Sequence, residues 1–208
     1  MKESEIPENW QMKKFGEVCP KDRYGYTTSS TKEENEVKFL RTTDLTDGPI
    51  KWDEVPYCEE LPENEESFLL EEDDIVISRS GSVGESALIK NPPRAVFASY
   101  LIRFKPRESM SPEYISYFLQ SPNYWRQVEE KAVATNQKNL NATKISEMRI
   151  PVPPIEEQEE IVSKIEELFT QLDSSNKALE NSIDKLDNYR RAVLDSGFSG
   201  DLFDENKE

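Results

Sequence analysis

The feature that most constrains this chain is a proline-rich joint followed by a long stretch without helix breakers. The joint reads Ile150-Pro151-Val152-Pro153-Pro154-Ile155, and about forty residues without Pro or Gly follow it. Two adjacent prolines cannot lie inside a helix, so the chain before Ile155 is expected to be extended. The residues after it are expected to form one helix that runs to Gly197, roughly 60 Å long at 1.5 Å per residue. A compact domain of this size does not need so long a helix.

Apolar residues recur every seven positions along this predicted helix, in two interleaved rows with a polar middle. Such a seam is typical of a coiled coil. The small side chains of Ser175 and Ser182 would let two helices approach closely, although they could equally lie on an exposed face. The residues predicted to form the helix–helix interface are Ile161, Ile165, Leu168, Leu172, Leu179, Leu186, Tyr189 and Val193.

Composition excludes several classes of protein. The 208 residues include no histidine, which removes Ser-His triads, Cys-His pairs and His-ligated zinc. Two isolated cysteines, Cys19 and Cys58, form neither a disulfide framework nor a metal site, and they fit a reducing cytoplasm. No run of 18 apolar residues could span a membrane, and the N-terminus lacks the apolar segment of a signal peptide. We therefore expect a cytoplasmic chain without metal, cofactor or catalytic residues of its own.

Charge is distributed unevenly along the chain. The net charge is −16, but residues 1–74 carry −12, residues 75–155 carry +5 and residues 156–208 carry −9. Only the middle segment could supply a face that contacts phosphates. The acidic remainder fits either a salty cytoplasm or a basic protein partner, and the sequence does not decide between them.

The first 149 residues are expected to form a mixed α+β domain. Alternating or apolar runs predict strands at 37–41, 75–78, 87–89, 95–98 and 100–104, and Asp47-Gly48 predicts a turn before a return strand at 50–52. Ser111-Pro112 and Ser121-Pro122 each place a capping serine before proline at the first helical position, so two helices are expected there. Residues 20–36 are expected to form a polar loop, and residues 53–66 an acidic one.

Three polar segments are candidates for contact with a ligand. Residues 79–84 combine an arginine, small hydroxyl side chains and two glycines, which suits phosphate binding, but the pattern alone favours an ordinary hairpin turn. The basic and aromatic residues of 21–32 suit either contact with a partner or a disordered surface loop. The amide-rich segment 134–141 has side chains that read adenine edges or satisfy turns, and composition alone favours turns.

Several of these segments, taken in order, resemble the specificity subunit of type I restriction–modification systems. The resemblance rests on short matches along the whole chain: Ile6-Pro7 with Trp10 and Phe15-Gly16-Glu17-Val18, Phe39 to Leu45 with Asp47-Gly48, Asp74 to Gly84, Asn139-Leu140-Asn141, Ile150 to Ile155 with Gln158, Ile161-Val162 and Ile165, and Arg190-Arg191 with Leu194, Gly197-Phe198 and Gly200.

The resemblance implies an architecture and a role. Family members usually carry two target-recognition domains joined by two long antiparallel helices, and each domain reads one half of a split DNA sequence. This chain offers one such domain, residues 1–149, and one helical region, residues 150–208. It therefore resembles a half subunit whose helix forms an antiparallel coiled coil in a homodimer, which would read a gapped palindrome.

The resemblance also implies partners. These are double-stranded DNA and a modification subunit that holds S-adenosylmethionine and methylates adenine; whether a translocase (restriction) subunit joins them stays open. By the match, Arg79 should face a phosphate or a guanine edge, and Arg41 is the second candidate. The full set of candidate DNA-binding residues is Lys21, Arg23, Tyr24, Tyr26, Thr27, Thr28, Arg41, Arg79, Ser80, Gly81, Ser82, Lys138, Asn139 and Asn141.

Three classes of function compete at this point. The first is a non-catalytic DNA-recognition subunit that works as a homodimer with methyltransferase partners. The second is an acidic interaction protein that occupies the methyltransferase and blocks or retunes it. The third is an independent enzyme, which the absence of histidine and of any nucleophile motif disfavours.

Overall fold

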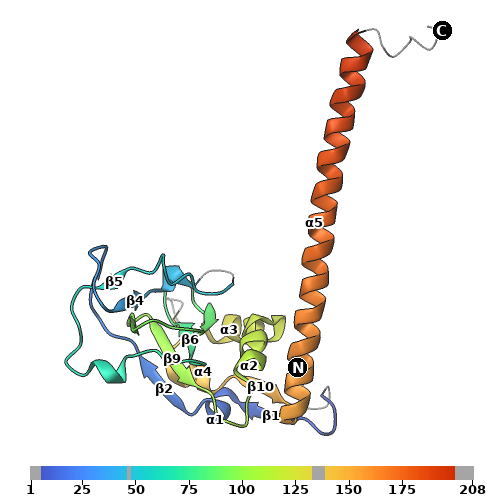
Figure 1. Cartoon of the computed structure of the whole chain (residues 1–208). Coiled ribbons are helices and arrows are strands. Elements are labelled where there is room, and N and C mark those ends of the chain that lie inside the picture. The colour runs from blue at the N-terminus through green and yellow to red at the C-terminus, as the bar shows by residue number, and fades with distance from the viewer. Residues whose placement is uncertain (1–5, 46–47, 133–138, 200–208) are drawn as a thin grey trace, which may run out of the picture. The chain divides into compact units, whose positions relative to one another are not determined.

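The computed structural model describes residues 6–45, 48–132 and 139–199. The chain divides into two compact units, Met1–Val162 (the globular unit) and Ser163–Glu208 (the helical unit). A single helix, α5 (Ile155–Ser199), begins in the first unit and continues through the second (Figure 1). It starts directly after Pro153-Pro154, where the sequence predicts the change from extended chain to helix. The domain boundary expected at residue 149 stays a prediction.

The centre of the globular unit is a four-stranded antiparallel sheet. Its strands are β2 (Lys21–Tyr24), β9 (Leu101–Lys105), β6 (Ile75–Ser78) and β7 (Ser86–Leu88), in that order. All four residues of β6 are buried, as expected for a short apolar run in the middle of a sheet. The four polar residues of β2 form an edge strand, so the expectation that residues 20–36 are one loop is wrong at this point. Ladder hydrogen bonds to β9 hold a segment that lacks any apolar pattern.

A second four-stranded sheet has the order β3 (Ser30–Thr31), β5 (Tyr57–Cys58), β4 (Lys38–Leu40) and β8 (Ala95–Phe97). The strands β4 and β8 run parallel, whereas the other two pairs are antiparallel. Residues 50–52 do not form the expected return strand, because β5 and β8 already occupy both edges of β4. Short helical turns η2 (Thr42–Asp44) and η3 (Glu65–Ser67) lie in the connections.

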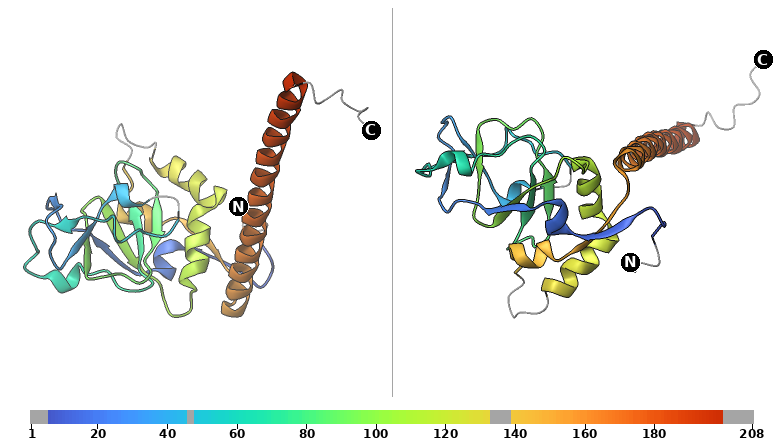
Figure 2. Two further views of the ribbon diagram at one scale, coloured as in Figure 1. Left: turned by 45° about the horizontal axis from the view of Figure 1, so that its top comes forward. Right: turned by 90° about the horizontal axis from the view of Figure 1, so that it is seen from below.

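Helices cover one face of the central sheet. Figure 2 shows α2 (Pro112–Gln120) and α3 (Pro122–Ala132) on one side of it and the β4–β5 region on the other. Both helices begin where the sequence predicts, and the Ser111 hydroxyl accepts the Tyr114 N–H at 3.1 Å. Two short helices, α1 (Phe15–Val18) and α4 (Ala142–Ser146), complete this layer; the sequence does not predict them.

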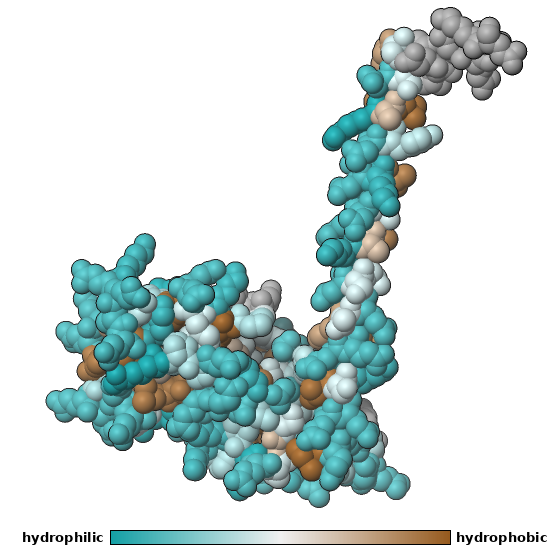
Figure 3. All heavy atoms as spheres, in the orientation of Figure 1, coloured by the Kyte–Doolittle hydropathy of each residue, from teal (hydrophilic) through white to brown (hydrophobic). Residues whose placement is uncertain are grey.

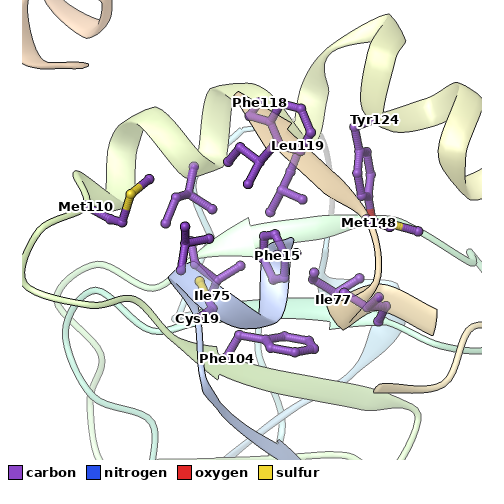
Figure 4. Packing of buried hydrophobic residues seen from close by; sticks show 14 of the residues in the cluster. Phe15, Cys19, Ile75, Ile77, Phe104, Met110, Phe118, Leu119, Tyr124 and Met148 are labelled. Carbon is purple, nitrogen blue, oxygen red and sulfur yellow. The ribbon is translucent and has the colours of Figure 1, made fainter. Parts of the chain in front are cut away.

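Two cores lie on the opposite faces of the central sheet. Alternate residues of β6 supply them, with Ile75 and Ile77 on the helical side and Val76 on the side of the second sheet. Figure 4 shows Tyr124 extending from its helix toward the sheet, and Phe15 between the helices above and the strand residues below. Partly buried Ile161 and Val162 of α5 also pack against the helical-side core.

The joint before α5 is part of this core. The strand β10 (Arg149–Val152) pairs antiparallel with β1 (Gln11–Lys14). Buried Gln158 accepts the Ser111 N–H at 2.9 Å and donates to the Pro153 oxygen at 3.0 Å. Glu157 accepts the indole N–H of Trp10 at 2.8 Å. The first turn of α5 is therefore fixed to the N-terminal segment and to α2.

The helical unit exposes an apolar surface. In Figure 3 apolar side chains recur along one side of α5 between hydrophilic ones. Seven of the eight predicted interface residues lie in this unit, and from Leu168 onward all of them are at least 41% exposed. The predicted α+β fold with one long C-terminal helix is confirmed, whereas the pairing of that helix with a second copy stays a prediction. In the described ranges no helix has the length and apolarity of a membrane span.

Candidate nucleic-acid interface

The connection from β6 to β7 holds Arg79 in place by its main chain. The Arg79 N–H donates to the Tyr100 oxygen at 2.9 Å, and the Arg79 oxygen accepts the Leu140 N–H at 3.1 Å. The connection closes a hairpin between β6 and β7, which is one of the two structures predicted for residues 79–84. Gly81 and Gly84 have φ values of +78° and +92°. Gly81 and Ser82 are exposed and Ser80 is half-buried.

The far end of this connection is packed against α3. The Tyr124 hydroxyl donates to the Gly84 oxygen at 2.8 Å, and a Cβ on Gly84 would lie 2.8 Å from Val128. Only glycine fits both this close approach and the positive φ. The hairpin tip is therefore exposed while both of its ends are anchored.

The Arg79 side chain lies over an aromatic ring. Its guanidinium carbon is 5.0 Å from the centre of the Tyr24 ring, a distance at which a cation and a ring attract. The Tyr24 hydroxyl accepts the Ala142 N–H at 3.0 Å, which ties the ring to the start of α4. Buried polar atoms usually have partners, yet Arg79 Nε and Asn139 Oδ1 are buried without a hydrogen bond within the described part of the chain.

Three segments far apart in sequence therefore meet around Arg79: Tyr24, the tip of residues 79–82, and residues 139–142. Of the predicted site residues, this Arg79 cluster contains Tyr24, Arg79, Ser80, Gly81, Ser82, Asn139 and Asn141. Asn141 has a structural task as well, because its side chain accepts the Lys144 N–H at 2.9 Å and caps α4.

Other predicted residues lie elsewhere. Side chains alternate along β2, so Arg23 and Tyr24 lie on different faces of the sheet. Arg23 pairs with Arg103 of β9 in the strand register. Its guanidinium carbon lies 4.6 Å from the centre of the Phe68 ring. The Tyr26 ring is 5.5 Å from the same Phe68 ring. A second aromatic group thus forms on Phe68, which the sequence analysis did not single out.

Arg41 is engaged with a neighbouring carboxylate. Its Nη2 lies 2.8 Å from Asp44 Oδ1 and its Nε donates to Oδ2 at 3.1 Å, a two-pronged pair. Hydrogen bonding to Asp44 raises the pKa of Arg41. The pair partly neutralises Arg41 and leaves only its remaining N–H donors for another contact. Lys21 and Thr27 are exposed and Thr28 is half-buried, while Lys138 lies outside the described residues.

The prediction for one surface residue beside Arg79 is wrong. Tyr100 was expected in a strand, but it lies in the turn between β8 and β9 and is 59% exposed. The apolar run around it hides the turn, since only Ser99 breaks the pattern. No group of three or more Cys, Asp or Glu side chains suited to a metal ion occurs in the described ranges.

The fold is an α+β domain followed by one long helix. Comparison with known proteins assigns the chain to a family. The family model described as "Type I restriction modification DNA specificity domain" matches residues 7–185. The chain belongs to this family, which confirms the resemblance drawn from the sequence.

Curated relatives and solved structures agree with this assignment. The chain is 25% identical to the EcoBI specificity subunit of Escherichia coli over 95% of its length, and 26% identical to the StySPI specificity subunit of Salmonella potsdam over 97%. It spans 43% and 45% of their lengths.

Two solved structures share the fold. The HsdS subunit from Thermoanaerobacter tengcongensis matches 95% of this chain and 46% of its own, with a TM-score of 0.65 and 23% identity. A chain from a structural study of assembly in a type I R-M system gives a TM-score of 0.71 and 22% identity, over 93% of this chain and 47% of the other. The chain thus spans about half the length of its relatives.

Proposed function

We propose that this chain is a non-catalytic, sequence-specific DNA-recognition subunit of a type I restriction–modification enzyme. The observation that carries the proposal is the Arg79 cluster. In a strongly acidic chain, a basic segment brings together half-buried Arg79 and Asn139, exposed Asn141 and small hydroxyl side chains. Arginine and asparagine are the side chains that most often read guanine and adenine edges.

The geometry favours Arg79 over Arg41 as the principal contact. Arg79 forms no ion pair with a carboxylate among the described residues, whereas Arg41 is neutralised by Asp44. Stacking on Tyr24 keeps the Arg79 guanidinium in a defined position without using its N–H donors. A preorganised arginine with free donors suits a phosphate or a guanine edge.

The second part of the proposal is a homodimer formed through α5. The exposed apolar residues from Leu168 to Val193 recur at heptad spacing, and a second copy of the helix in antiparallel orientation would cover them. Such a two-fold dimer carries two recognition domains and reads a gapped palindrome. The methyltransferase partner, with its S-adenosylmethionine, then modifies adenine in the cytoplasm.

The acidic composition supports a competing candidate function. Residues 1–74 carry a net charge of −12, which suits a protein that occupies a basic docking surface on the methyltransferase and blocks it. This candidate predicts a stable complex without sequence preference and a loss of methylation on co-expression.

The methylome of a cell that expresses this chain with its methyltransferase subunit tests both candidates. A gapped palindrome methylated on adenine is the expected result. A gapped asymmetric motif would show that a different second half is recruited, and would overturn the homodimer alone. A stable complex without methylation would overturn the recognition function and favour the blocking one.

A further inference from the structure

Large apolar side chains are rarely exposed on the globular unit, and two of them lie beside Arg79. Within the described part of residues 6–162, those classed as exposed are Tyr24 at 38%, Leu61 at 49% and Tyr100 at 59%. Tyr24 lies against the Arg79 guanidinium, and the Tyr100 main chain is bonded to the Arg79 main chain. Tyr100 is the most exposed of the three.

The turn that carries Tyr100 is held on three sides by main-chain hydrogen bonds. The Leu101 N–H closes it on the Ala98 oxygen at 2.8 Å. The Ser99 N–H donates to the Tyr26 oxygen at 2.9 Å, and the Tyr100 oxygen accepts from Arg79 at 2.9 Å. The backbone of Tyr100 is therefore fixed between the Arg79 cluster and the segment after β2, while its side chain extends into solvent.

A close backbone approach makes this turn and the end of β2 one surface. A Cβ on Gly25 would lie 2.2 Å from the Ala98 oxygen, so only glycine lets the two segments meet. The Gly25 N–H also donates to the Leu101 oxygen at 3.1 Å. Tyr100 is consequently carried by a rigid part of the scaffold, as a precise contact requires.

We propose that Tyr100 is a specificity-determining residue that contacts a base edge of the recognised DNA next to the position read by Arg79. A tyrosine ring offers a large apolar surface at a low cost in side-chain entropy, and its hydroxyl can donate or accept a hydrogen bond. Base edges in the major groove present both hydrogen-bonding groups and the thymine methyl group. The inference rests on the proposed function and adds to it a residue that reads sequence.

The test compares Tyr100→Ala with Leu61→Ala in the full chain, each assembled with the methyltransferase subunit. Leu61 is the matched control, because it is the third exposed apolar side chain of the globular unit and has no contact with the Arg79 cluster among the described interactions. Methylomes are recorded, and binding is measured on duplexes in which each base pair of the motif is replaced in turn.

Tyr100→Ala is expected to lose about 5- to 150-fold of discrimination at one base pair of each half-site, with unchanged discrimination elsewhere. Tyr100→Phe then assigns the contact to the ring or to the hydroxyl. An unchanged motif would overturn the inference, and so would an equal weakening on all sequences, which marks a phosphate contact. A wild-type complex without sequence preference would overturn the proposed function and the inference together.

Discussion

The guanidinium of Arg79 and the ring of Tyr24 form a cation–aromatic pair at 5.0 Å that joins the β6–β7 hairpin to strand β2. The Tyr24 hydroxyl is itself bonded to the main chain of Ala142, so the ring cannot turn away without losing a hydrogen bond. The pair places a charged side chain on a fixed support at the surface. Tyr24 is therefore best understood as a residue that positions Arg79.

This relationship predicts coupled effects on DNA binding. Arg79→Ala should weaken binding by about 1–3 kcal/mol and leave the dimer intact. Tyr24→Leu should cost about 0.5–2 kcal/mol in the wild-type background and much less beside Arg79→Ala, because the ring acts through the arginine. Tyr24→Phe keeps the ring and should cost less than Tyr24→Leu. Fluorescence anisotropy at one moderate salt concentration compares the wild type with these four variants, and strictly additive losses would contradict the positioning role.

The two glycines of the hairpin should respond differently to alanine. Both have positive φ, but a Cβ meets nothing within 4 Å at Gly81 and lies 2.8 Å from Val128 at Gly84. Gly81→Ala should lower the free energy of unfolding by about 1 kcal/mol, from backbone strain alone. Gly84→Ala should cost about 1–3 kcal/mol more, because α3 must also shift. Urea unfolding of the two variants gives both values, and equal losses would show that the packing against α3 is not tight.

The sequence predicts those elements whose structure is determined by residues close to one another in the chain. Pro153-Pro154 sets the start of α5, and each Ser-Pro pair sets the start of a helix, because proline restricts its own φ and the residue before it. The buried run of β6 is equally clear. These elements depend on neighbours in the sequence.

The elements that were missed depend on contacts between distant segments. Strand β2 has a polar sequence and is a strand because it pairs with β9. Strand β4 pairs with β8 and not with residues 50–52. The candidate site also has parts that nearby residues determine and parts that contacts between distant segments determine. The glycines mark the Arg79 hairpin, but the meeting of that hairpin with Tyr24 and the Tyr100 turn follows from strand pairing, which composition does not encode.

The thiol of Cys19 should be unreactive in the folded protein. Burial raises its pKa to about 12, and burial also raises the pKa of Cys58. Both thiols should therefore resist a disulfide reagent at pH 8 until denaturant is added, since the thiolate is the reactive form. Because the folded pKa is raised, the folded state keeps its proton, and stability should fall as the pH rises from about 8.5 toward 12. Labelling of Cys58→Ala and Cys19→Ala assigns each site; rapid labelling of native Cys19 would contradict its burial.

The buried side chain of Gln158 should contribute more to the free energy of unfolding than an exposed glutamine side chain on a helix. It is fully buried, and its side chain satisfies the Ser111 N–H and the Pro153 oxygen. Gln158→Leu leaves both groups without a partner and should cost about 1–3 kcal/mol for each. Exposed Gln120 is the control, and Gln120→Leu should change the urea midpoint little.

A carboxylate at the same position should make that loss depend on pH. Gln158→Glu can still accept from Ser111, but it would bury a charge, which raises the pKa of the new carboxyl group. The protonated form is then favoured in the folded state, so the variant should be more stable at pH 5 than at pH 8 relative to wild type. An equal loss at both pH values would mean that water reaches the site.

The exposed seam of α5 should hold the proposed dimer together. Leu179 and Leu186 are 63% and 67% exposed in the single chain and lie one heptad apart. Leu179→Asp with Leu186→Asp would bury two unpaired charges in a coiled coil and should convert a dimer into monomers. Asn181→Asp with Asn188→Asp adds the same charge at the same spacing outside the seam, and should leave the dimer unchanged. Sedimentation velocity distinguishes the species.

The pattern of outcomes also tests which surface carries the pairing. If the leucine variant sediments as a monomer and the asparagine variant as a dimer, the apolar row forms the interface, because charge alone is matched between the two. If both variants dissociate, repulsion between acidic helices is responsible, and the loss should diminish at high salt. A leucine variant that remains dimeric would place the interface elsewhere on the chain and contradict the pairing of two α5 helices.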